Sequence, residues 1–359
     1  MKKILILTAG YGEGHNSAAR GIRDGLASHA PDARVEMRDL FSESYGFFNE
    51  LIRKGYLALI NRWPRSWGYV YRWLENKKDF DRDFRKFRRL KSKLAQLLSS
   101  FQPDVIVSVF PAYPYLLGQV SEGPRAWKNV VVVTDSITVN AIWYRCSADY
   151  FLVPNDESAA VLRAGGIGRE LIQVFGFPVS PRFAKLTRPR SAPSAPNRQV
   201  LYMINPASLR AVELVRQLLE LDIQLTVTVG RNEKVHRAVQ TVAGNRPIKI
   251  LGWTDELPRI LAASHLVIAK AGGATVQEAI AAACPMIINH IVSGQEEGNA
   301  QLIVQTNSGV IAHSPAEVVA QVKRAFADDA KQWRTWATNI SQLSRPRASL
   351  EIAEFLLSL

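Results

Sequence analysis

The stretch that decides the fold runs from His265 to Ala300 and reads HLVIAKAGGATVQEAIAAACPMIINHIVSGQEEGNA. A short apolar run leads into two glycines, then into small and apolar residues at helical spacing, and then into a second apolar run. Strand, glycine turn, helix and strand in this order are typical of a unit with parallel strands. The stretch therefore predicts an α/β domain that carries its ligand groups where the first strand ends.

The same alternation of apolar runs and helical patterns continues on both sides of this stretch. Residues 187–199 interrupt it, because they are rich in proline, serine and arginine and fit no periodic element. We predict a Rossmann-like domain over residues 1–186, a linker over 187–199 and a second such domain over 200–344. The last helix, at about residues 345–359, is expected to pack back on the first domain. Two doubly wound domains that face each other predict a ligand cleft between the carboxyl ends of their sheets.

Composition excludes several classes of protein. The 359 residues are 47% hydrophobic and 21% charged, which suits two folded domains and not a disordered chain. Only two cysteines are present, so a disulfide framework is excluded and a cysteine-based zinc site is not expected. No apolar run approaches the roughly 20 residues that span a bilayer, and the start, MKKILILTAG, lacks the features of a signal peptide. A reducing cytoplasm is the expected compartment.

The glycine turn of the deciding stretch carries the sharpest functional signal. Gly272 and Gly273 leave room for a phosphate beside the backbone, and a helix that opens near Thr275 offers free N–H groups to a diphosphate. Glu278 follows one turn later, where a carboxylate can accept from both hydroxyls of a ribose. The simpler interpretation is a tight turn with a solvent-facing glutamate and a polar loop. Trp253 either stacks on a base or packs in the core. The candidate donor-binding residues are Gly272, Gly273, Ala274, Thr275, Glu278, Gln295, Glu296, Asn299 and Trp253.

The segment TAGYGEGHNSAA, after the first apolar run, is the second signal. Gly12 and Gly14 belong to a flexible turn that opens a helix and can serve an acceptor or a phosphate. His15 at the start of this helix can accept a proton from an attacking hydroxyl, or it simply caps or packs. Asp135 ends a buried valine run and can orient His15, contact the acceptor or cap a helix. No metal-binding motif accompanies these residues, so neither a metal nor another cofactor is expected.

Most of the net charge of +13 lies between Arg53 and Lys93, where 14 Lys/Arg stand against 4 Asp/Glu, a difference of +10. Aromatic residues are interspersed among these charges. An anionic membrane surface attracts both kinds of side chain, although a solvated helix with its aromatics on the core explains them too. Nucleic acid is not the expected partner, because no nucleic-acid motif is present. The candidate membrane-binding residues are Trp63, Trp67, Arg82, Arg85, Lys86, Arg88 and Arg89.

These segments together resemble the monogalactosyldiacylglycerol synthases and the related bacterial diacylglycerol glucosyltransferases over essentially the whole chain. The resemblance rests on ILTAGYGEGHNSAA, the basic aromatic stretch, VVTDS followed by IWY, GFPVSPRF, KAGGATVQEA and SGQEEGNA. The last two blocks are shared with the lipid-II N-acetylglucosaminyltransferase. The resemblance implies a GT-B fold, a UDP-sugar donor in the second domain and an inverting, metal-free reaction. It also implies a diacylglycerol acceptor in the first domain, at the cytoplasmic face of the membrane.

One departure from the family pattern leaves alternatives open. The second domain of the family opens with a glycine-containing loop, whereas this chain has Asn205, Pro206, Ala207 and Ser208. The first hypothesis is transfer of galactose or glucose from a UDP-sugar to diacylglycerol or a similar lipid. The second is transfer of N-acetylglucosamine to a polyprenyl-linked acceptor. The third, which this loop favours, is a silent membrane-bound sensor of nucleotide sugars.

Overall fold

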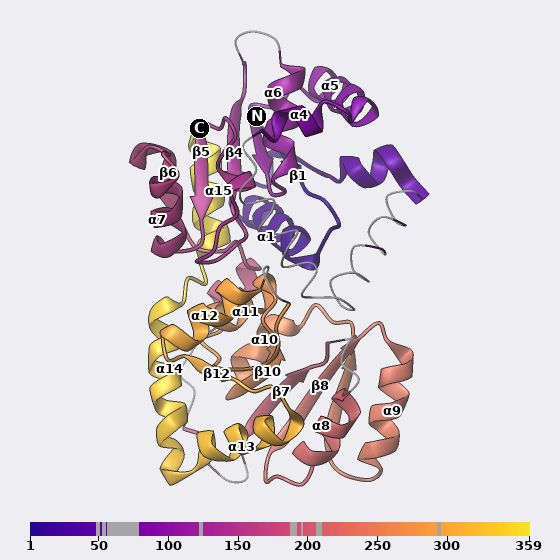
Figure 1. The fold of residues 1–359 in the computed structure, drawn as a ribbon, viewed down its shortest axis with the longest axis vertical. Helices are drawn as coiled ribbons and strands as arrows, with labels where there is room; N and C mark the ends of the chain where they lie inside the picture. Colours follow the sequence, from indigo (N-terminus) through magenta and orange to yellow (C-terminus); the bar gives the residue numbers. More distant parts are fainter. Residues whose placement is uncertain are drawn as a thin grey trace. The chain divides into compact units, whose positions relative to one another are not determined.

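A computed structural model of the protein forms two compact units (Figure 1). The first unit comprises Met1–Pro181, Val292–Gly298 and Arg347–Leu359, and the second comprises Arg182–Ile291 and Asn299–Pro346. The residues that the structure describes are 1–47, 51, 55, 79–121, 125–186, 192–194, 197–205, 210–292 and 296–359. Most of the predicted linker, as well as Trp63, Trp67 and Gln295, lies outside the described residues.

The first unit contains a parallel sheet of six strands in the order β2-β1-β3-β4-β5-β6. Its central strands are rich in valine and isoleucine and are buried on both faces. In β3, for example, all four residues are buried. The strands are β1 (Lys3–Leu7), β2 (Arg34–Arg38), β3 (Val105–Ser108), β4 (Lys128–Val132), β5 (Tyr150–Val153) and β6 (Ile172–Val174). The helices are α1 (Glu13–His29), α4 (Asp81–Phe84), α5 (Arg88–Phe101), α6 (Ala112–Val120), α7 (Asp156–Ala164) and α15 (Ala348–Ser358), with 3₁₀ turns at Ala141–Trp143, Arg169–Leu171 and Pro181–Lys185.

The second unit contains another parallel sheet of six strands, in the order β12-β11-β10-β7-β8-β9. Its strands are β7 (Gln199–Met203), β8 (Gln224–Gly230), β9 (Ile248–Gly252), β10 (Leu266–Lys270), β11 (Met286–His290) and β12 (Gly309–Ile311). Its helices are α8 (Ala211–Leu218), α9 (Glu233–Ala243), α10 (Leu257–Ala263), α11 (Gly273–Ala281), α12 (Glu297–Gln305), α13 (Pro315–Phe326) and α14 (Lys331–Leu343), with a 3₁₀ turn at Asp328–Ala330. The first two residues of α12 fall in the first unit.

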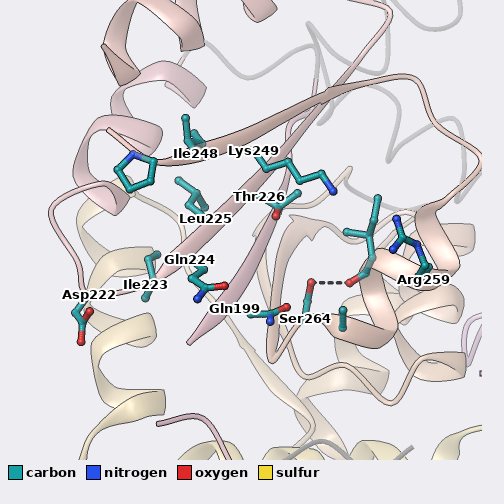
Figure 2. A pocket seen from close by; sticks show the side chains of 13 residues that line it. Gln199, Asp222, Ile223, Gln224, Leu225, Thr226, Ile248, Lys249, Arg259 and Ser264 are labelled. Atoms are coloured by element: carbon teal, nitrogen blue, oxygen red, sulfur yellow. Dashed lines mark hydrogen bonds between the residues drawn. The ribbon is translucent and has the colours of Figure 1, made fainter. Parts of the chain in front are cut away.

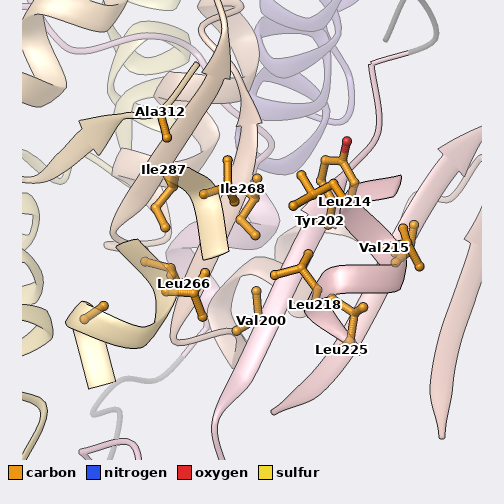
Figure 3. Packing of buried hydrophobic residues seen from close by; sticks show 14 of the residues in the cluster. Val200, Tyr202, Leu214, Val215, Leu218, Leu225, Leu266, Ile268, Ile287 and Ala312 are labelled. Carbon is orange, nitrogen blue, oxygen red and sulfur yellow. The ribbon is translucent and has the colours of Figure 1, made fainter. Parts of the chain in front are cut away.

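The core of the second unit lies between its sheet and the helices α8 and α13 (Figure 3). Alternate residues of β8, such as Leu225 and Val227, are buried against this side, while Gln224 and Thr226, which alternate with them, are not. Leu214, Val215 and Leu218 of α8 recur at helical spacing and meet those strand residues. The predicted architecture of two doubly wound α/β domains is therefore confirmed.

The last helix, α15, packs on α1 within the first unit. Gly25 of α1 permits this close approach, because a Cβ atom there would collide with the backbone carbonyl of Ser349. The ring of Phe355 meets Tyr150 edge-on, with 5.1 Å between the ring centroids. Among the described residues, no helix is both long and apolar enough to cross a membrane.

Each sheet has one point where the chain order reverses, and open α/β sheets bind ligands at the carboxyl ends of strands beside such a point. In the first unit it lies between β1 and β3, and in the second between β7 and β10. The turn that leads to His15 follows β1, and the two glycines, Gly272 and Gly273, follow β10. The topology thus brings both predicted sites to the edges where ligands bind.

Candidate functional site

His15 lies at the reversal point of the first sheet, in the first turn of α1. Gly12 precedes the helix with φ of 143°, a backbone conformation that side chains rarely adopt, and no side chain caps the helix end. A Cβ at Gly14 would meet no atom within 4 Å among the described residues. The Gly10 N–H donates to Asp39 Oδ2 at 3.0 Å, which ties the turn to the end of β2. The turn is therefore anchored at its start and open where the helix begins.

Three residues from other elements surround the His15 ring. Thr134, which follows β4, places its Oγ1 3.1 Å from His15 Nδ1. Phe110, which follows β3, meets the ring edge-on with 5.2 Å between centroids. Trp143 lies 5.8 Å away at 45°. Burial lowers the pKa of His15 to about 4, and a hydrogen bond with the Val109 backbone opposes this change only in part. The imidazole is therefore held neutral.

Asp135 has a different neighbour from the one that the sequence suggested first. Its Oδ2 accepts a hydrogen bond from Trp143 Nε1 at 2.9 Å, and its backbone carbonyl accepts from Ser158 Oγ at 3.3 Å. The carboxylate thus fixes the indole that lines the His15 ring. A direct role of Asp135 in catalysis stays a prediction. The valine run indicated where Asp135 lies in the fold. Its contact with Trp143 has no sequence signature, because it depends on the 3₁₀ turn at Ala141–Trp143.

A row of aromatic rings runs from His15 toward α4 and the start of α5, which lie in the basic stretch of the sequence. Phe110 stacks on Tyr11 with 5.8 Å between centroids and meets Phe41 at 5.5 Å. Phe41 in turn meets Phe87 at 6.1 Å, and Phe87 meets Phe84 at 6.0 Å. The described aromatics of the basic stretch therefore pack inward on the domain core. The five predicted basic residues are all exposed: Arg82, Arg85, Lys86, Arg88 and Arg89.

The predicted donor site of the second unit is built on the end of β10. Gly272 is the N-cap of α11 and has no side chain to cap it, so the helix opens with free N–H groups. Gly273, Ala274 and Thr275 form its partly exposed first turn. Glu278 lies one turn further and is also partly exposed. The dipole of α11 adds a positive potential at this end, which suits a diphosphate.

Asn299 and Glu296 turn out to brace the backbone. Asn299 Nδ2 donates to the Ala271 carbonyl oxygen at 3.1 Å, and its side-chain oxygen is buried without a partner among the described residues. Within the first unit, Glu296 Oε2 accepts from the Val292 N–H at 3.1 Å. Both side chains are at least nine-tenths buried. Contact of either residue with a sugar stays a prediction.

Trp253 follows β9 and is 65% exposed, so the core interpretation of this residue is wrong. The Arg231 guanidinium, just after β8, lies over its ring at 5.3 Å from the centroid. An exposed indole at the carboxyl edge of the sheet offers a flat face to a base. Stacking on the donor base stays a prediction.

A cavity of 760 Å³ in the second unit lies elsewhere (Figure 2). It is lined by Gln199, Gln224 and Lys249, near the amino ends of β7, β8 and β9, and by the end of α10. The predicted donor residues lie at the carboxyl ends of the strands. This cavity is therefore separate from the predicted donor site. Among the described residues, no cluster of three or more His, Cys, Asp or Glu is arranged to hold a metal ion.

Comparison with known proteins shows which families the chain resembles. Residues 15–179 match the family model of monogalactosyldiacylglycerol synthase, and residues 206–345 match that of the C-terminal domain of family 28 glycosyltransferases. The chain is a glycosyltransferase, and over residues 15–179 it is similar to the monogalactosyldiacylglycerol synthases. A curated relative, the chloroplastic monogalactosyldiacylglycerol synthase of Spinacia oleracea, is 26% identical over 377 residues, which cover 99% of this chain and 72% of the relative.

Solved structures agree on the fold of this glycosyltransferase. MurG of Acinetobacter baumannii aligns over the whole of both chains with a TM-score of 0.62 at 14% identity. HepE of Anabaena, solved with UDP and glucose, also aligns over the whole of both chains, with a TM-score of 0.54 at 15% identity. Identities this low show the fold alone, which is GT-B.

Proposed function

We propose that this glycosyltransferase moves a hexose, galactose or glucose, from a UDP-sugar to diacylglycerol or a similar lipid. The observation that carries the donor half of the proposal is the uncapped start of α11 at the reversal point of the second sheet. Its N–H groups and dipole favour a diphosphate, and Glu278 is placed one turn away for a ribose. HepE, a protein of the same fold, was solved with UDP and with glucose, which supports this class of donor.

The acceptor half of the proposal rests on His15 and on the names of the curated relatives. In the proposed reaction, a lipid hydroxyl gives its proton to His15 as its oxygen bonds to the anomeric carbon of the sugar. The bond from that carbon to the diphosphate breaks, and UDP leaves with the electron pair. Attack from the side opposite UDP inverts the anomeric centre. A neutral imidazole suits this step, since a protonated one has no lone pair to offer. The proposed reaction uses no bound metal or other cofactor.

The proposal places the protein on the cytoplasmic face of the cell membrane as a peripheral protein. The exposed basic residues between positions 82 and 89, in and between α4 and α5, support it, because each Lys or Arg near an anionic leaflet is worth about 1 kcal/mol. Nucleic acid is not proposed as a partner.

The test measures UDP release from a panel of UDP-sugars. Diacylglycerol in anionic vesicles is the first acceptor, a polyprenyl-linked acceptor is the second, and a parallel series contains EDTA. Release with diacylglycerol and a UDP-hexose, unchanged by EDTA, is the expected result. Release only with UDP-N-acetylglucosamine and the polyprenyl acceptor would replace the proposed substrates. Binding of UDP without release from any pair would identify a silent nucleotide-sugar sensor.

A further inference from the structure

Among the described residues, the side chain of Thr134 makes a polar contact with the His15 ring from a different element of the fold. Its Oγ1 lies 3.1 Å from Nδ1, and the residue is 6% exposed. We propose that Thr134 is the positioning residue of His15: it keeps the ring proton on Nδ1 and so leaves Nε2 as the nitrogen that accepts a proton. The inference rests on the proposed function, in which His15 is the base.

The surroundings hold both partners of this contact in place. Thr134 follows Val133, whose N–H donates to the Leu152 carbonyl at 2.9 Å and so continues the pairing of β4 with β5. A β-branched threonine has few side-chain conformations, which limits where its hydroxyl can point. Phe110 and Trp143 confine the imidazole on two other sides. The ring is therefore packed by apolar groups and has two hydrogen-bond partners, the Thr134 hydroxyl at Nδ1 and the Val109 backbone.

The direction of this hydrogen bond decides what His15 can do. A neutral imidazole has one N–H and one lone pair, on different nitrogens. If Nδ1–H donates to Thr134, the lone pair of Nε2 is available for the proton of an acceptor hydroxyl. If the threonine hydroxyl donates instead, Nε2 carries the hydrogen and can only donate. Only the first arrangement serves a base at Nε2.

A hydroxyl partner differs from a carboxylate because it carries no charge. Three titratable residues at the ends of neighbouring strands have contacts with other groups. Asp39, after β2, accepts from the Gly10 N–H, and Asp135, after β4, accepts from Trp143. Tyr11, from the turn after β1, stacks on Phe110. Thr134 thus orients the ring without placing a negative charge beside it, and in the proposed step His15 takes up a proton as the acceptor oxygen bonds to the sugar.

The experiment compares wild type, Thr134→Val and Thr134→Ser. Ring nitrogens are observed by ¹⁵N NMR in histidine-labelled protein, and the His15 signals are assigned by their loss in His15→Gln. Wild type and Thr134→Ser should show Nδ1 protonated and Nε2 bare, whereas Thr134→Val should show a mixture of the two forms. In the transfer assay, Thr134→Val should lower kcat at least tenfold with an unchanged KM for the donor, and Thr134→Ser should restore most of the rate.

Two results would overturn the inference. One is a wild-type ring that carries its hydrogen on Nε2. The other is a Thr134→Val protein that keeps both the wild-type ring form and the wild-type kcat. If wild type transfers no sugar, the proposed function fails, and the NMR comparison still decides whether Thr134 sets the ring proton.

Discussion

The side-chain amide of Asn299 donates to the carbonyl oxygen of Ala271, 28 residues earlier in the chain, at 3.1 Å. Ala271 is fully buried and directly precedes Gly272, the N-cap of α11. The contact therefore joins α12 to the turn on which the proposed diphosphate site is built. Asn299 supports this turn through the Ala271 carbonyl, and this support does not depend on which groups the donor contacts.

Replacing Asn299 with leucine should loosen this turn. The change keeps the size of the side chain but leaves the Ala271 carbonyl without its donor, which costs about 1–3 kcal/mol for a buried group. We expect a lower free energy of unfolding in urea and a weaker affinity for UDP by calorimetry. Asn339→Leu is the matched control, because Asn339 donates to the Asn307 carbonyl at an exposed position. Equal losses in both variants would remove the special role of Asn299.

Glu278→Ala should weaken binding of the UDP-sugar and leave the fold intact. Glu278 is partly exposed, so its removal empties no core site. Loss of a charge-assisted contact to the ribose predicts roughly a tenfold weaker affinity, since such bonds contribute about 1.5–3 kcal/mol. The measurement is calorimetric titration with UDP, with Glu278→Gln as the variant of equal size. Unchanged affinity in the alanine variant would exclude Glu278 from the site.

The lowered pKa of His15 predicts how stability depends on pH. The native pKa is about 4 against a reference value of 6.5, so between these values the unfolded chain binds more protons than the native one. Stability should therefore rise with pH from 4 to 6.5 and fall on acidification, by at most about 3 kcal/mol. His15→Gln should flatten this slope of the unfolding midpoint, while His313→Gln, at an exposed position, should not. A wild-type slope in His15→Gln would show that the ring titrates normally.

The same pKa predicts the acidic limb of the rate profile. If His15 is the base, kcat/KM should hold as the pH falls below 6.5 and should decline only near pH 4. The pH profile of kcat/KM for Thr134→Ser should match that of the wild type. A decline centred near pH 6.5 would mean that the free enzyme has an exposed, ordinary histidine at this position.

Attachment to anionic vesicles should depend on the exposed basic residues in and between α4 and α5. The variant in which Arg82, Arg85, Lys86, Arg88 and Arg89 all become serine should bind such vesicles less at low salt, with a smaller difference at high salt. The control removes five exposed charges from the second unit, namely Arg216, Lys234, Arg237, Lys323 and Arg324. Co-sedimentation that falls equally in both variants would indicate an effect of net charge alone.

The sequence predicted the architecture well because strand and helix patterns are local. Runs such as KILIL and KNVVV are buried strands, and the glycines after β10 do open a helix. The bracing contacts could not be predicted, because they depend on three-dimensional neighbours. Asn299 was predicted as a donor-binding residue, which stays a prediction, but no pattern in the sequence indicated that its amide donates to a carbonyl 28 residues away.

The surroundings of His15 show the same limit. The segment that contains Thr134 and Asp135 pointed to the end of a buried strand, but nothing local distinguishes which of the two side chains meets His15. In the folded chain, Thr134 contacts the imidazole of His15, and Asp135 accepts a hydrogen bond from Trp143. The five basic residues are exposed, as a surface role requires, whereas the predicted tryptophans Trp63 and Trp67 lie outside the described residues.

The most direct test of the proposed reaction is the mass of the lipid product. Wild-type protein and His15→Ala would each be incubated with diacylglycerol in anionic vesicles and one ¹³C-labelled UDP-hexose at a time, and the extracted lipids analysed by mass spectrometry. The proposal predicts diacylglycerol that carries a labelled hexose from one donor, and its loss in His15→Ala. Labelled glycolipid formed equally well by His15→Ala, or none formed by wild type from any UDP-hexose, would contradict it.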